Sequence, residues 1–499
     1  MANKNTELTR GAGLLLPVSS LPSPYGIGTF GKAGYDFVDT LVEAKQIYWQ
    51  VLPLGPTSYG DSPYQSFSAF AGNPYFIDLD TLIEEGILKK SEVEAYDWGQ
   101  DDSKVDYEAI YNSRFHVLKK AFERSKHQTQ KSYIQFCNEN EYWLDDYSLY
   151  MAIKNHFESK EWLLWDEDIR FRKPEAVASY QKKLKNDVDF WKFCQYKFYE
   201  QWFALKAYAN KKGIQIIGDI PLYVAMDSSD VWVHGDLFEL DERKKPINIA
   251  GVPPDCFSVT GQRWGNPLYD WNKMEQDDFS WWRKRMSASA KLYDVVRIDH
   301  FIGIVRYFRI PAECETAERG KYKKGPGSKL TKVIVESIGD AKIIAEDLGV
   351  IIPSVRQLME RTGFPGMKIL QFAFNSGPES EYLPHNYKTS NTVVYGGTHD
   401  NQTLVGYLKN MEKKEEQYAC EYLGVKRKND IPDAVVKLAY ASNAAVAIFQ
   451  VQDILKLDDQ ARMNLPSSLG GNWQWRMTKG QLSQEDIMRL HTLADTYGR

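Results

Sequence analysis

The chain has 499 residues, of which 43% are hydrophobic and 26% charged, and its formal net charge at pH 7 is −5. This composition predicts a soluble globular protein with a large core, and it lacks the basic excess by which proteins hold nucleic acid. No apolar stretch reaches the about 18 residues of a membrane span, so we expect neither a membrane nor a nucleic-acid partner.

Eight short apolar segments are predicted as strands. They cover residues 13–16, 48–52, 215–217, 295–298, 342–345, 369–372, 392–395 and 447–449. Helical patterns lie between several of them, over 30–44, over 354–361 with Gly363 as a stop signal, and over 434–441. Alternating strands and helices favour a parallel sheet, and eight units favour a closed barrel. The predicted fold class is therefore α/β, a (β/α)8 TIM barrel.

Long insertions interrupt this pattern. Residues 81–201, between the second and third strands, are rich in helix formers and aromatic residues, and we interpret them as a mostly helical inserted subdomain. The barrel would then comprise residues 1–80 and 202–499. Two further stretches, 221–282 and 312–328, carry Pro, Gly and Asn at short intervals and are predicted to be long active-site loops.

Aromatic residues make up 13% of the chain, with 14 Trp and 30 Tyr. An aromatic ring packs well on the apolar C–H face of a sugar, so a sugar is a candidate ligand, although most rings are expected in the core. The five cysteines are widely spaced and form no CxxC pair. They are typical of reduced thiols, and with no apolar leader we expect a cytoplasmic protein.

A glycine pattern at Gly26, Gly28 and Gly31 resembles a dinucleotide-binding fingerprint. Prolines separate it from the preceding strand, so the strand–turn–helix context of that fingerprint is missing. His and Asp show no metal-ligand spacing either. We therefore expect no cofactor.

Three carboxylates directly follow predicted strands: Asp299 in VVRIDHF, Glu346 in KIIAEDLG and Asp400 in VVYGGTHDN. The carboxyl ends of parallel strands meet at one edge of the sheet, where α/β barrels place their chemistry. A single acid there is as readily a helix cap, but three acids with Arg297 and His399 nearby indicate a shared pocket.

The neighbours of these acids suggest separate roles. Arg297 and Asp299 are two residues apart on one strand and point the same way, so the guanidinium is expected to favour the ionised carboxylate, which suits a nucleophile. The apolar run before Glu346 favours its neutral form, which suits a general acid. Such a pair cleaves glycosidic bonds. Asp219, after the third strand, either joins this polar rim or pairs with Arg297.

Seven motifs then reveal a family resemblance. The chain resembles the 4-α-glucanotransferases, or amylomaltases, of glycoside hydrolase family 77 over nearly its whole length. The motifs are LPLGPTSYGDSPYQSFSAFAGNP (52–74), GDIPLYVA (218–225), GVPPDCFSVTGQRWGNPLY (251–269), RIDHF (297–301), AEDLG (345–349), GTHDN (397–401) and RMNLPSSLGGNWQWR (462–476). The family fold is a (β/α)8 barrel with inserted subdomains, as expected above.

The resemblance implies roles for nine residues. Asp299 would be the nucleophile, Glu346 the acid/base and Asp400 the stabiliser of the transition state. The implied glucan contacts are Tyr59, Asp219, Phe257, Trp264, Arg297 and His399. Where the family commonly has Tyr before Phe257, this chain has Cys256, whose thiol cannot stack on a sugar.

The implied activity is transfer of α-1,4-glucan segments between maltooligosaccharides through a covalent glucosyl-Asp intermediate, with no cofactor. The partners would be maltooligosaccharides and glucans derived from starch or glycogen, and the protein a monomer or small homo-oligomer. Two alternatives remain, a retaining α-1,4-glucan hydrolase with the same three acids and a non-catalytic glucan-binding barrel.

Overall fold

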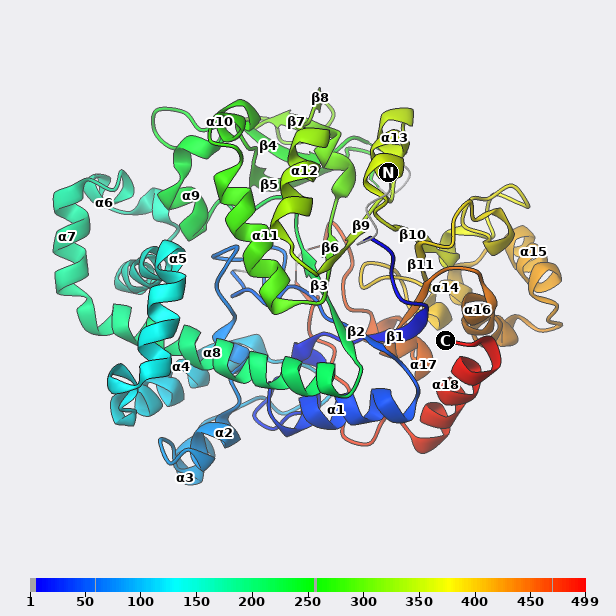
Figure 1. The fold of residues 1–499 in the computed structure, drawn as a ribbon, viewed down its shortest axis with the longest axis horizontal. Helices are drawn as coiled ribbons and strands as arrows, with labels where there is room; N and C mark the ends of the chain where they lie inside the picture. Colours follow the sequence, from blue (N-terminus) through cyan, green and yellow to red (C-terminus); the bar gives the residue numbers. More distant parts are fainter. Residues whose placement is uncertain (1–5, 59, 255–257, 469) are drawn as a thin grey trace.

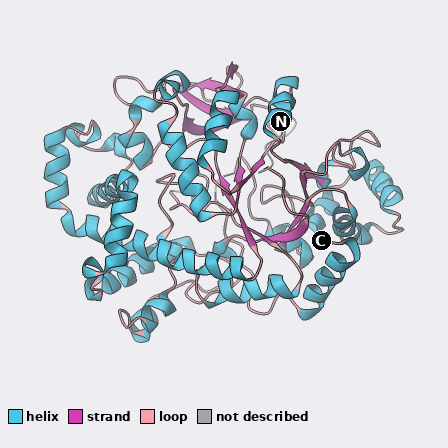
Figure 2. Ribbon diagram, in the orientation of Figure 1, coloured by secondary structure: helices cyan, strands magenta, loops and turns pink. Residues whose placement is uncertain are grey.

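The computed structural model describes residues 6–58, 60–254, 258–468 and 470–499. Its centre is an eight-stranded sheet in the order β10-β11-β12-β1-β2-β3-β6-β9, in which all paired neighbours are parallel. The strands are β1 (Gly11–Leu15), β2 (Tyr48–Gln50), β3 (Gln215–Ile220), β6 (Val295–Ile298), β9 (Lys342–Ala345), β10 (Gly366–Ile369), β11 (Thr392–Tyr395) and β12 (Val446–Gln450). The sheet curls into a nearly closed barrel (Figures 1 and 2), so the predicted TIM barrel is confirmed.

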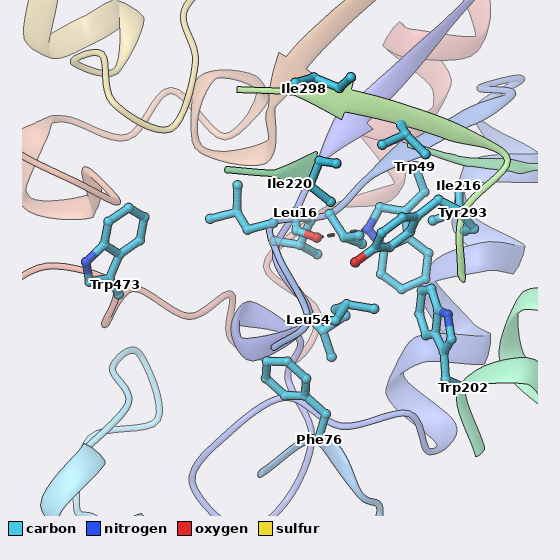
Figure 3. Packing of buried hydrophobic residues seen from close by; sticks show 14 of the residues in the cluster. Leu16, Trp49, Leu54, Phe76, Trp202, Ile216, Ile220, Tyr293, Ile298 and Trp473 are labelled. Carbon is cyan, nitrogen blue, oxygen red and sulfur yellow. Dashed lines mark hydrogen bonds between the residues drawn. The ribbon is translucent and has the colours of Figure 1, made fainter. Parts of the chain in front are cut away.

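The barrel strands are short because each is an apolar run bounded by polar or turn residues. Their alternate side chains, such as Ile217, Val295 and Ile344, form one buried cluster, and the side chains on the other face pack against the surrounding helices. Figure 3 shows part of this outer packing, in which the indole N–H of Trp49 donates to the carbonyl of Leu16 at 2.9 Å.

One predicted strand is misplaced. We expected residues 369–372, but the strand β10 ends at Ile369 and residues 370–372 form a single 3₁₀ turn. Gly366 pairs with Thr392 at the start of β11, so the ladder begins three residues earlier than the apolar run suggests. The apolar residues at 369–372 therefore reflect burial of their side chains and do not mark the residues that pair with β11.

Helices surround the barrel. Between β2 and β3 lie α2 (Leu79–Glu84), α3 (Lys90–Val93), α4 (Tyr107–Arg124), α5 (Lys131–His156), α6 (Glu167–Arg170), α7 (Pro174–Lys183) and α8 (Lys185–Lys211). The long α8 leads back into the barrel, and its Trp202 donates to the carbonyl of Leu292 at 3.1 Å. Figure 1 shows α4 to α7 gathered on one side of the barrel.

The other helices follow the strands in turn. They are α1 (Lys32–Glu43), α9 (Ser229–Val233), α10 (Trp271–Gln276), α11 (Ser280–Leu292), α12 (Ser328–Ser337), α13 (Pro353–Thr362), α14 (Leu404–Asn410), α15 (Lys413–Leu423), α16 (Ile431–Ala441), α17 (Val451–Ile454) and α18 (Gln484–Tyr497). The predicted stop after α13 is confirmed, because Gly363 adopts a left-handed conformation with φ +68°. Within the described residues, no helix is both long and apolar enough to cross a membrane.

A second, antiparallel sheet was not predicted. It has the order β5-β4-β7-β8 and consists of β4 (Asn248–Val252), β5 (Gln262–Pro267), β7 (Arg306–Pro311) and β8 (Lys321–Lys324). Of these strands, β4, β5 and β8 lie within the stretches 221–282 and 312–328 that were predicted to be loops, because they contain Gly, Pro, Asn and Lys. At Gly251 a side chain would collide with the carbonyl of Gln262, 2.1 Å from the Cβ position, so this pairing requires glycine. The sheet lies in the connections that follow β3 and β6, at the carboxyl end of the barrel.

Candidate active site

A buried arginine joins two of the acids at the carboxyl ends of neighbouring strands. Asp219 on β3 and Arg297 on β6 are partners in the strand register, and Arg297 Nη1 lies 2.7 and 2.6 Å from the two Asp219 carboxylate oxygens. The same nitrogen lies 3.1 Å from Asp299 Oδ1. Asp219 thus pairs with Arg297, one of the two roles left open above, and it lies at the same rim.

Glu346 follows β9 and is held by the backbone. Its two carboxylate oxygens accept the N–H groups of His300 and Leu348, both at 2.7 Å. Burial nevertheless raises the pKa of Glu346 to about 7, although Arg297 and the two N–H groups oppose the shift. This is the direction expected from the apolar run before it. A carboxyl group with this pKa can donate and accept a proton near neutral pH.

The electrostatics of Asp299 differ from the expectation. Burial and the negative charges of Asp219, Glu346 and Asp400 together raise the pKa of Asp299 well above its ordinary value, although Arg297 lowers it. We had expected Arg297 to favour the ionised form. The reason for the difference is that the Arg297 guanidinium is already bound by Asp219, so it offsets only part of the cost of burying a second carboxylate.

Two residues near the carboxyl terminus of the chain, Arg462 and Asn464, hold Asp400 in position. Asn464 Nδ2 donates to Asp400 Oδ1 at 2.6 Å, and Arg462 donates to the Asp400 carbonyl at 2.5 Å. The other carboxylate oxygen lies 3.4 Å from His399 Nε2. Burial lowers the pKa of His399, which favours a neutral imidazole. The Asp400 side chain is 42% exposed and so can reach a ligand.

Tyr64 connects two parts of the site, and the sequence did not single it out. Its hydroxyl donates to Asp219 Oδ2 at 2.9 Å, and its ring stacks on His399 with centroids 5.1 Å apart. Tyr64 belongs to the motif over 52–74, in which the resemblance had pointed to Tyr59. Asn464 was missed in the same way, within the motif over 462–476.

Trp264 belongs to the second sheet and lies beside the acids of the barrel. Its ring, on β5, meets the edge of the His300 imidazole with centroids 4.8 Å apart. Gln65 Nε2 donates to the Trp264 carbonyl at 3.4 Å, which ties β5 to the segment that carries Tyr64. Tyr59, Cys256 and Phe257 lie outside the described residues.

The structure therefore brings together seven of the nine predicted site residues. Four of them lie at or just after barrel strands β3, β6 and β9, and His399 and Asp400 follow β11. Among the described residues, no group of three or more His, Cys, Asp or Glu is arranged to hold a metal ion. The barrel, with buried acids at the carboxyl ends of its strands, defines a (β/α)8-barrel enzyme.

Comparison with known proteins gives the family. Residues 16–483 match the family model described as 4-alpha-glucanotransferase. A 4-alpha-glucanotransferase of Streptococcus pneumoniae is 50% identical over 97% of both chains, and one of Thermus thermophilus is 45% identical over 99% of this chain and 100% of the relative. The chain belongs to the 4-alpha-glucanotransferase family, and it is a glycosyltransferase.

The solved structures agree with this assignment. An amylomaltase from Streptococcus agalactiae, in complex with acarbose, superposes with a TM-score of 0.95 at 44% identity and covers 98% of this chain and 99% of that one. Fold and sequence therefore match along the whole length of the chain.

Proposed function

We propose that this enzyme transfers α-1,4-glucan segments between maltooligosaccharides by two successive displacements, with Asp299 as the nucleophile. In the first step an Asp299 oxygen attacks the anomeric carbon. Glu346 gives its proton to the glycosidic oxygen, and the shortened glucan leaves. A covalent glucosyl-Asp299 ester and an ionised Glu346 result.

In the second step a glucan 4-hydroxyl attacks the same carbon. Glu346 takes the hydroxyl proton, the new α-1,4 bond forms, and Asp299 leaves as a carboxylate. Asp299 and Glu346 return to their starting states. One α-1,4 bond is broken in the first step and one is made in the second. No external cofactor is consumed.

One observation carries this assignment of roles. Asp299 Oδ1 contacts Arg297 at 3.1 Å while its side chain stays 29% exposed, so an oxygen is accessible for attack, and Arg297 offsets part of the cost of ionising it. Glu346 is 7% exposed, bound at both oxygens and has a pKa of about 7, which suits proton transfer better than attack.

The remaining residues are proposed to bind the glucan. Asp400 and His399 would contact hydroxyl groups of the sugar that is transferred. Asp219 and Arg297 would form the edge of the same sugar-binding site. Trp264 would stack on the acceptor side, together with Tyr59 and Phe257, whose roles rest on the resemblance alone. We also propose that residues 81–201, which contain α3 to α7 and most of α2 and α8, form a subdomain inserted into a barrel of residues 1–80 and 202–499.

Incubation with maltotriose tests the proposal. A transferase releases glucose and forms chains longer than maltotriose, because a second glucan and not water accepts the glucosyl group. If shorter sugars alone accumulate, the protein is the hydrolase considered above. If maltotriose binds and remains unchanged, the non-catalytic alternative holds.

A further inference from the structure

A cavity lies outside the candidate active site. Its volume is about 160 Å³, and residues of α5, α9 and α11 contribute to its lining, on the side of the barrel that carries the helical segment (Figure 1). The residues that matter here are Tyr142, Trp143, Asp230, His234, Trp281 and Lys284. None of them belongs to the candidate active site.

Aromatic rings form one wall of this cavity. Phe70 meets Tyr142 and Trp281 edge-on, with centroid distances of 5.7 and 6.0 Å. The Tyr142 side chain is 37% exposed, whereas Trp281 is 4% exposed. Because the rings brace one another, Tyr142 presents its surface to the cavity in a fixed orientation, which suits the apolar C–H face of a sugar.

Polar groups on the other walls offer both donors and acceptors. The buried Asp230 uses one carboxylate oxygen to accept the N–H of Ala69 at 2.8 Å. The buried indole N–H of Trp281 interacts with the Asp230 carboxyl group and lowers its pKa, which burial raises. The ammonium of Lys284 and the ring of His234 complete the lining. A sugar hydroxyl both donates and accepts, so it can satisfy this mixed set.

A cation fits the cavity less well, although several aspartates surround it. Asp146 is already ion-paired with Arg172 at 2.7 Å, and Asp277 accepts the N–H of Ser280 at 3.2 Å in a local turn. Lys284 adds a positive charge. Arg172 thus neutralises Asp146, and among the described residues no group of three or more His, Cys, Asp or Glu is arranged to hold a metal ion, which favours a neutral polyhydroxyl ligand.

The cavity shares two chain segments with the active site. Ser68 and Phe70 follow Tyr64 in the motif over 52–74, and Asp230 lies in the connection that follows Asp219 and β3. A long substrate held in the active site can therefore place a more distant part of the same chain near the cavity.

We propose that this cavity binds glucosyl units of an α-glucan outside the active site and so strengthens the enzyme's hold on long chains. The inference rests on the proposed function, because it takes an α-glucan as the substrate. Short oligosaccharides, which fill only the active site, gain nothing from it.

Retardation in native gels containing amylose tests this proposal on the full-length protein. Tyr142→Ala and Lys284→Ala are suitable variants because both side chains are exposed, and Tyr322→Ala is a matched control on β8, where Tyr322 is 43% exposed. The loss of one ring contact should raise the dissociation constant for amylose about fivefold in Tyr142→Ala. Lys284→Ala should shift it in the same direction, and Tyr322→Ala should not.

Turnover of maltotriose separates this proposal from the one on which it rests. All three variants should turn over maltotriose at the wild-type rate, because their active sites are intact. Wild-type retardation in both Tyr142→Ala and Lys284→Ala would overturn the second site, and so would a loss of retardation that always accompanies an equal loss of maltotriose turnover. If wild-type enzyme makes no product longer than maltotriose, the proposed function itself fails.

Discussion

The ring of Tyr64 stacks on the imidazole of His399 with an angle of 13° between their planes, while the Tyr64 hydroxyl donates to Asp219. One side chain therefore joins the residues that follow β11 to those at the end of β3. This contact fixes the relative position of two polar groups that we propose to bind the transferred sugar.

Tyr64→Phe removes the hydroxyl and keeps the stacked ring. The buried Asp219 oxygen loses one donor but keeps Arg297, so kcat/KM on maltotriose should fall about tenfold, the equivalent of one hydrogen bond. Tyr64→Ala also removes the ring and should cost more. Equal losses in the two variants would show that stacking on His399 contributes nothing.

Arg297→Lys should change the pH dependence as well as the rate. A lysine ammonium cannot take the place of the rigid guanidinium, whose Nη1 contacts both Asp219 and Asp299, so turnover should fall by about a hundredfold. Asp299 must be ionised to attack, and a weaker cation lets its pKa rise further. The acidic limb of the kcat/KM profile should therefore move to higher pH. Arg427→Lys, at an exposed ion pair with Asp430, is the control and should leave the profile unchanged.

The pKa of Glu346 predicts where the basic limb of the same kcat/KM profile lies. The proton that Glu346 donates is present below its pKa of about 7 and is lost as the pH rises through that value, so kcat/KM should fall there. Glu346→Gln should lower turnover of maltotriose at least about a thousandfold, because glutamine cannot donate the proton. The variant should still fold, because the two side chains have nearly the same size. Glu360→Gln, exposed on α13, should behave as wild type. An unchanged basic limb in Glu346→Gln would assign that limb to another group.

A buried ion pair attaches the helical segment to the barrel. Lys154 on α5 contacts Asp227 at 2.6 Å and is 5% exposed, and Tyr150 donates to the same carboxylate at 2.6 Å. Lys154→Met leaves Asp227 without its cation and should reduce the free energy of unfolding by about 3 kcal/mol. The effect is measured by urea denaturation.

The matched control is Lys32→Met, because Lys32 and Asp36 form an exposed pair with side chains 85% and 58% accessible. That change should cost less than about 0.5 kcal/mol. If the two variants lose equal stability, the Lys154 pair does not support the fold in this way.

The sequence predicted the barrel well because its strands carry a strong local signal. The strands β6, β9 and β11 begin and end at the predicted residues, since each is a short apolar run followed by polar residues. The second sheet has no such signal. Its strand β8 reads KYKK and is exposed throughout, so only pairing with β7 makes it a strand.

The site shows the same division between local and distant causes. The position of Asp299 follows from strand periodicity, but its pKa depends on Asp219, 80 residues away in sequence, which binds the same guanidinium. The contact of Tyr64 with His399 joins segments that no local pattern relates. The proposed contacts of Tyr59 and Phe257 stay predictions, because both residues lie outside the described part of the chain.

The most direct test of the central claim is to trap the covalent intermediate. In Glu346→Gln, α-maltosyl fluoride can still react, because fluoride leaves without a proton donor, while the second step lacks its base and slows. Peptide mass spectrometry of the quenched enzyme should then find a maltosyl group on Asp299. A maltosyl group on a different side chain, or fluoride release with no modified peptide, would contradict the assignment of Asp299 as the nucleophile.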